Sequence, residues 1–82
     1  MTKEEATDFI SLHYPTYMGK LVFFEEAKIT ARVKAIEALE DDGGEYVPTC
    51  YLEDPEENDT SFQNHLFSHM SLEDVIRLGR IV

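Results

Sequence analysis

The chain has 82 residues, with seventeen acidic against seven basic side chains and therefore a net charge of −10. Nucleic acids and anionic membranes are bound through basic patches, so this charge argues against direct binding to either of them. A hydrophobic content of 43% predicts one folded domain over residues 1–82, and a single cysteine without a signal-peptide pattern predicts a cytoplasmic location.

The first segment has the pattern of a helix. Thr2 followed three residues later by Glu5 predicts a capping box, in which each side chain bonds the other residue's backbone N–H. Apolar and aromatic residues then recur at helical spacing: Ala6, Phe9, Ile10 and His13. Pro15 is expected to end this helix, because the residue before a proline avoids the α region, and residues 14–17 are expected to form a connector.

Residues 20–24, Lys-Leu-Val-Phe-Phe, have a composition that favours a β-strand. The segment 25–42 allows two interpretations, since its apolar residues fit strand alternation and also, at Ile29 and Val33, one face of a helix. Acidic residues at its C-terminal end would oppose a helix dipole, and Asp-Asp-Gly-Gly at 41–44 is a favourable hairpin turn. We therefore expect a strand here and keep the helix as the alternative.

The chain after this turn continues with β and loop patterns. Residues 46–52 have a clear β pattern, in which Pro48 predicts an edge position or a bulge because proline has no N–H to donate. Residues 53–60 are expected to form an acidic loop, and residues 62–70 are expected to contain a further strand.

The C-terminal segment has the signals of a short helix. Ser71 is expected to be its N-cap and Gly79 its end, and residues 80–82 are expected to finish as a short strand. The whole order predicts an α+β fold, with an N-terminal helix and a small, curved, mainly antiparallel β-sheet that could be an SH3-like partial barrel. The alternative, with residues 25–41 helical, is an αβαββ order.

The charge is distributed unevenly along the chain. Residues 37–60 hold ten acidic residues and no Lys or Arg, whereas each flanking segment holds equal numbers of acidic and basic residues. Because concentrated like charge costs self-repulsion, the stretch indicates either a solvated surface or a surface for a basic partner. The candidate partner-binding residues are Glu37, Glu40, Asp41, Asp42, Glu45, Glu53, Asp54, Glu56, Glu57 and Asp59.

Metal binding and catalysis have little support in the sequence. Cys50 with His65 and His69 could form a zinc site, but no second cysteine or paired motif accompanies them. Cys50 with either histidine could also form a nucleophile and base, but no glycine-rich elbow is present. Since a phosphate loop and a dinucleotide fingerprint are also absent, we expect no enzyme activity, no metal and no cofactor.

One short segment resembles a known class of binding peptides. Gln63, Leu66 and Phe67 match the anchoring positions of the peptides that bind the bacterial sliding clamp. The resemblance implies clamp binding only if the segment is accessible, and Leu66 and Phe67 would equally suit a protein core.

The expected function is binding, without chemistry. Short acidic chains that lack catalytic motifs resemble, in size and charge, phage-encoded inhibitors of host defence and toxin-immunity proteins. We therefore expect the carboxylate-rich residues 37–60 to block a basic, nucleic-acid-binding surface of a protein partner, with no direct contact to nucleic acid or membrane. The alternative is a structural or regulatory module that docks into a larger protein assembly through an apolar sheet edge.

Overall fold

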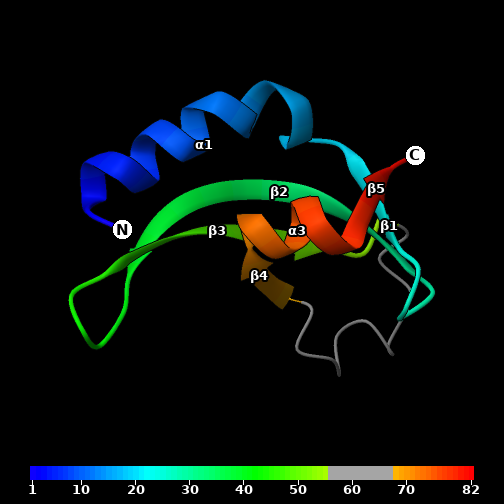
Figure 1. The fold of residues 1–82 in the computed structure, drawn as a ribbon. Helices are drawn as coiled ribbons and strands as arrows, with labels where there is room; N and C mark the ends of the chain where they lie inside the picture. The colour runs from blue at the N-terminus through cyan, green and yellow to red at the C-terminus, as the bar shows by residue number, and fades with distance from the viewer. Residues whose placement is uncertain (56–67) are drawn as a thin grey trace.

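The computed structural model describes residues 1–55 and 68–82, which form two helices and one five-stranded sheet (Figure 1). In chain order the elements are α1 (Lys3–Tyr17), β1 (Leu21–Phe24), β2 (Ile29–Glu40), β3 (Tyr46–Glu53), β4 (His69–Ser71), α3 (Leu72–Leu78) and β5 (Gly79–Ile81). Neighbouring strands are antiparallel, in the order β4-β3-β2-β1-β5. The expected α+β class is confirmed, and the αβαββ alternative is wrong because residues 29–40 form a strand.

α1 begins and ends on local hydrogen bonds. The expected capping box is confirmed: the Glu5 N–H donates to Thr2 Oγ1 at 3.1 Å, and the Thr2 N–H donates to Glu5 Oε1 at 2.8 Å. The expectation that Pro15 ends the helix is wrong, because α1 continues beyond it. Pro15 lies in the last turn, where its missing N–H costs a single intrahelical bond. The helix then closes with the Met18 N–H donating to the Tyr14 carbonyl at 2.9 Å.

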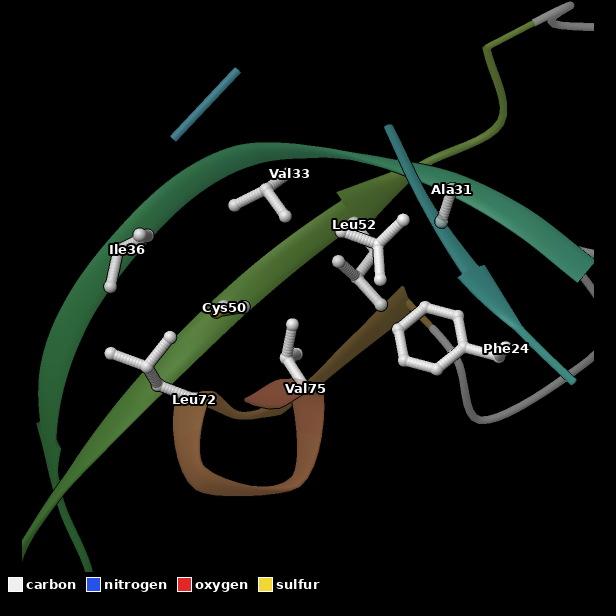
Figure 2. Close-up of a cluster of buried hydrophobic side chains, with 9 residues drawn as sticks. Phe24, Ala31, Val33, Ile36, Cys50, Leu52, Leu72 and Val75 are labelled. Atoms are coloured by element: carbon white, nitrogen blue, oxygen red, sulfur yellow. The ribbon is translucent and has the colours of Figure 1, made fainter. Parts of the chain in front are cut away.

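β2 contains a bulge that keeps its core-facing residues on one side. Its register against β3 shifts between Val33 and Ala35, so Lys34 is the extra residue. Regular alternation after Val33 would turn Ile36 away from the core, but the bulge returns it to the buried face, as Figure 2 shows. The alternation predicted from the sequence therefore holds up to Val33 and reverses beyond Lys34.

α3 follows the signals of its sequence. The Asp74 N–H donates to Ser71 Oγ at 3.1 Å, which confirms Ser71 as the N-cap, and Gly79 forms the C-cap. Arg77 lies one turn from Asp74 and forms an exposed ion pair with it at 2.9 Å. The short strand expected at the end of the chain is also present, as β5 over Gly79–Ile81.

The sheet curves because one short helix joins its two edge strands. α3 links the end of β4 at Ser71 to the start of β5 at Gly79, and a helical link of this length spans about 12 Å. The edge strands of a flat five-stranded sheet would lie about 19 Å apart. The sheet must therefore bend towards a barrel, but it stays open because β4 pairs with β3 and β5 pairs with β1, and the two edges do not pair with each other.

The core lies on one face of the sheet. Its buried side chains come from β1, β2, β3 and α3 (Figure 2): Val22, Phe24, Ala31, Val33, Ile36, Cys50, Leu52, Leu72 and Val75. Phe9 and Ile10 of α1 pack against the same cluster, so both described helices lie on that face. Neither of these helices is long and apolar enough to cross a membrane.

Pro48 lies in β3 at a position where no neighbouring strand requires a backbone N–H to donate a hydrogen bond. The Tyr46 N–H points away from β2 and donates to the Met1 carbonyl at 2.8 Å, and the nitrogen of Pro48, two residues on, lies on that same side. β4 pairs with β3 only over Thr49–Tyr51, so no described strand lies beside Pro48 there. The prediction of an edge strand is wrong for β3, which lies between β4 and β2, but Pro48 falls in the part of β3 that β4 does not reach. The bulge of this hairpin lies in β2.

Candidate functional site

The structure separates the predicted acidic residues into two groups. The first group lies on the β2–β3 hairpin near its turn, and we call it the hairpin carboxylates: Glu37, Glu40, Asp41, Asp42 and Glu45. All five are exposed. The second group, at the other end of β3, is Glu53 and Asp54. The remaining predicted residues, Glu56, Glu57 and Asp59, lie outside the described residues.

The two groups are too far apart to act as one charged face. Glu37, the hairpin carboxylate nearest to Glu53, pairs with Thr49, which lies four residues before Glu53 on β3, and four strand residues span about 13 Å. Exposed charges are largely screened beyond a Debye length, about 8 Å at physiological ionic strength. A partner would therefore meet two separate acidic centres along β3.

Asp41 shapes the turn of the hairpin. Its Oδ1 accepts hydrogen bonds from the Gly43 N–H at 2.9 Å and from the Glu45 N–H at 3.0 Å. Gly44 adopts a φ of 81°, which only glycine reaches without strain. The hairpin turn expected from the sequence is confirmed, and the carboxylate of Asp41 is largely committed to holding it.

Two further hairpin carboxylates have partners within the chain. The Tyr46 hydroxyl donates to Glu40 Oε2 at 3.2 Å, and this bond raises the pKa of Tyr46. The terminal amine of Met1 donates to Glu45 Oε2 at 2.6 Å, and this bond raises the pKa of that amine. Glu40 and Glu45 thus face a partner with part of their hydrogen-bonding capacity already used.

Glu37 and Asp42 are the hairpin carboxylates most available to a partner. Both are exposed, and neither side chain makes a hydrogen bond or an ion pair within the part of the chain that the structure describes. Each can therefore form a new ion pair without first breaking an internal one. Any experiment on binding should begin with these two residues, because changing them leaves the turn intact.

The start of α1 adds negative charge to this end of the molecule. The pKa of the Met1 amine is raised first by its bond to Glu45, and further by the charges of Glu5 and Asp41. Glu5 therefore lies in the same electrostatic environment as the hairpin. Sequence reasoning missed it, because no local pattern connects residues so distant along the chain.

Glu53 has a basic neighbour. Arg32 of β2 is its direct cross-strand partner, and Arg32 Nη1 lies 3.4 Å from Glu53 Oε1. This ion pair balances the charge of Glu53. Among the hairpin carboxylates, Glu45 alone has an ion-pair partner in the described residues, the Met1 amine, and no Lys or Arg side chain occurs between residues 37 and 45. The hairpin is the stronger candidate surface for a basic partner.

The geometry does not form a site at Cys50. Cys50 is fully buried and faces Met70 across the sheet, whereas His69 pairs with Tyr51, the next residue along β3. Strand alternation turns adjacent residues to opposite faces, so His69 cannot act as a base for Cys50. His65 lies outside the described residues, and within the described part of the chain no three His, Cys, Asp or Glu residues are grouped to hold a metal ion.

The Cys50 thiol should react with a disulfide reagent only when the protein opens. Burial raises the pKa of Cys50 to about 11, and such a thiol is only about 0.1% thiolate near pH 8. We expect labelling of the native protein to be at least about a hundredfold slower than labelling in urea, because it requires an opening of the fold. The measurement is absorbance of the released chromophore, and equal rates in both conditions would contradict the buried position.

The segment that resembles clamp-binding peptides, with Gln63, Leu66 and Phe67, also lies outside the described residues.

Comparisons of the chain with models of protein families, with curated proteins and with solved structures find no match. The function therefore has to be argued from the residues of the chain itself.

Proposed function

We propose that this protein acts in the cytoplasm by binding a basic surface with which another protein holds nucleic acid, and that it blocks that surface. The observation that carries the proposal is the separation of charge: five exposed carboxylates lie on the hairpin, with no Lys or Arg side chain among residues 37–45. Glu53 and Asp54, with Glu56, Glu57 and Asp59, form a second set that would extend the contact.

The charge and the exposure of the hairpin carboxylates suit such a role. Side chains on one face of a strand recur about every 6.6 Å, and the neighbouring strand lies about 4.8 Å away. A strand of DNA presents one phosphate about every 3.4 Å along its axis. Glu37 and Glu45 lie on one face of the hairpin about 13 Å apart along the strands, with Leu39 and Val47 between them. They therefore match a phosphate backbone in the sign of their charge and in exposure, at a wider spacing, and a surface rich in Lys and Arg would accept either.

The test neutralises the two available carboxylates. Glu37→Gln with Asp42→Asn removes two charges and leaves the turn, the Tyr46 bond and the Met1 ion pair in place. The matched control, Glu25→Gln with Glu26→Gln, removes the same charge from the β1–β2 turn, at the opposite end of β2. Glu5 is unsuitable as a control, because it belongs to the capping box and lies in the same electrostatic environment as the hairpin.

Wild-type, variant and control proteins are immobilised and exposed to a lysate of the native host. We expect the wild type and the control to retain a basic nucleic-acid-binding protein, and the Glu37/Asp42 variant to bind it about 5- to 30-fold more weakly. The loss should appear mainly in the association rate and should shrink at high salt, because exposed charges steer association. The purified partner should release a labelled DNA duplex when the wild type is added.

Two results would overturn the proposal. One is that the Glu37/Asp42 variant and the Glu25/Glu26 control bind the captured partner equally well. The other is that the captured partner holds its DNA duplex while bound to the wild type. In either case the hairpin carboxylates are a solvated surface, and the contact lies elsewhere.

A second candidate function is docking into a larger assembly through an apolar sheet edge. One observation favours it: β5 is an edge strand, and beside the exposed Arg80 it ends in two exposed apolar residues, with Ile81 42% and Val82 65% exposed. Binding through this edge would persist at high salt and would be lost in Ile81→Lys, since an apolar contact is not screened. The same captured partner can be tested with both sets of variants.

A further inference from the structure

The outer face of the hairpin carries an apolar pair. Leu39 and Val47 are direct cross-strand partners in β2 and β3, and each is 36% exposed. Leu39 lies three residues from the buried Ile36, and Val47 lies three residues from the buried Cys50. Strand alternation therefore turns both side chains away from the core. The pair lies on the sheet face opposite the two described helices.

Carboxylates lie on this face beside the apolar pair. Glu37 precedes Leu39 by two residues in β2. Glu45 precedes Val47 by two residues and lies just before β3, where its carbonyl still accepts the Asp41 N–H at 2.8 Å, so the strand pairing extends to it. Each carboxylate is therefore on the same side as the apolar residue. The Glu45 side chain remains 65% exposed although it binds the Met1 amine. On both strands the outer face thus presents a carboxylate and then an apolar side chain, about 6.6 Å apart.

We propose that Leu39 and Val47 anchor a segment of the protein partner in which Lys or Arg alternates with apolar residues. This inference rests on the proposed function and adds the sequence pattern that the hairpin recognises. Alternating residues of an extended chain point the same way with the same spacing as the hairpin side chains. A basic and an apolar set can therefore meet Glu37 and Leu39 on one strand, and Glu45 and Val47 on the other.

Charge complementarity selects this occupant over others. A second copy of the chain would bring the same carboxylates against Glu37 and Glu45, and an anionic membrane or a nucleic acid would also bring negative charge. A purely basic segment would satisfy the carboxylates but leave Leu39 and Val47 in water. The alternating segment contacts both the carboxylates and the apolar pair. Its apolar contact would keep its contribution to binding at high salt, because it is not screened.

The test uses two synthetic peptides of equal length and charge, one alternating Arg with Leu and the other alternating Arg with Ser. Binding is measured by isothermal titration with wild type and with Leu39→Thr/Val47→Thr, which keeps residues that favour strands. We expect the wild type to bind the Arg-Leu peptide about tenfold more tightly than the Arg-Ser peptide at about 500 mM salt. We expect this preference to fall below about threefold in the double variant.

The controls separate this inference from the proposed function. Leu12→Gln changes another exposed leucine, 73% exposed on α1, and should keep the full preference. Far-UV circular dichroism checks that the double variant is folded, and Val47→Thr alone provides a milder change. If the double variant keeps the preference while Glu37→Gln/Asp42→Asn weakens the binding of both peptides at low salt, the apolar anchor is wrong and the proposed function is not touched by this result. If the charge variant weakens the binding of neither peptide at low salt, where the carboxylates are little screened, the proposed function fails, and this inference fails with it.

Discussion

Leu72→Ala should lower the free energy of unfolding by about 2–5 kcal/mol, which is the usual cost of removing a buried leucine side chain. Leu72 is fully buried in the core cluster, where it points from α3 towards the strands (Figure 2). α3 has seven residues, too few to stay helical without packing. A chain of this length is stabilised by about 4–12 kcal/mol in total, so the variant should lose a large part of its stability. Urea unfolding followed by circular dichroism measures the change.

Leu12→Ala is the matched control for this experiment. It removes the same atoms from a helix, but Leu12 is 73% exposed and does not belong to the core cluster. We expect its effect on the free energy of unfolding to stay within about 0.5 kcal/mol. Equal losses in the two variants would mean that α3 does not pack as described.

Gly79→Ala should also destabilise the fold, by about 1–3 kcal/mol, through overpacking. A Cβ at Gly79 would clash with Val22 Cγ1 and would lie 3.0 Å from both Phe24 Cε1 and the Val75 carbonyl oxygen. Val22 is fully buried and the carbonyl belongs to the backbone, so neither can move aside at low cost. The change is expected to lower the melting temperature by several degrees, about 4–8 °C per kcal/mol in a domain of this size.

Gly43→Ala serves as the control for the glycine substitution. A Cβ there would lie 3.5 Å from Asp41 Oδ1, which is an ordinary contact, and Gly43 has no positive φ. The added methyl group restricts the unfolded chain, so we expect the melting temperature to be unchanged or slightly raised. A marked drop in the melting temperature of Gly43→Ala, together with no drop for Gly79→Ala, would contradict the close approach of β5 to β1.

The elements that could be predicted from the sequence are those whose ends depend on nearby residues. The caps at Thr2 and Ser71 and the turn at Asp41 each join groups no more than four residues apart. The bulge at Lys34 depends on how β2 must curve to keep Ile36 in the core, which no local pattern shows. The prediction that Pro15 ends α1 is wrong because a proline in the last helical turn removes only one intrahelical hydrogen bond.

The candidate site could be predicted in composition but not in arrangement. The acidic stretch in the sequence contains the hairpin carboxylates. The length of β3 places Glu53 at its far end, and the pairing of β3 with β2 places it beside Arg32. The ion pair between Glu45 and the Met1 amine joins residues 44 positions apart, with α1, β1 and β2 between them in the sequence. Such contacts follow from the fold, and the sequence contains no signal for them.

The strand order has a consequence for self-assembly. β1, Leu21–Phe24, is apolar and aromatic, the kind of segment that forms fibrils when its edges are free. In the folded chain β2 covers one edge of β1 and β5 covers the other, so both rows of backbone groups are occupied. β5 has three residues and follows directly on α3, so any change that loosens α3 uncovers one edge of β1. α3 and β5 thus keep the fibril-prone strand β1 covered. Variants that weaken α3 or β5 should be recovered as aggregates more readily than as unfolded monomers.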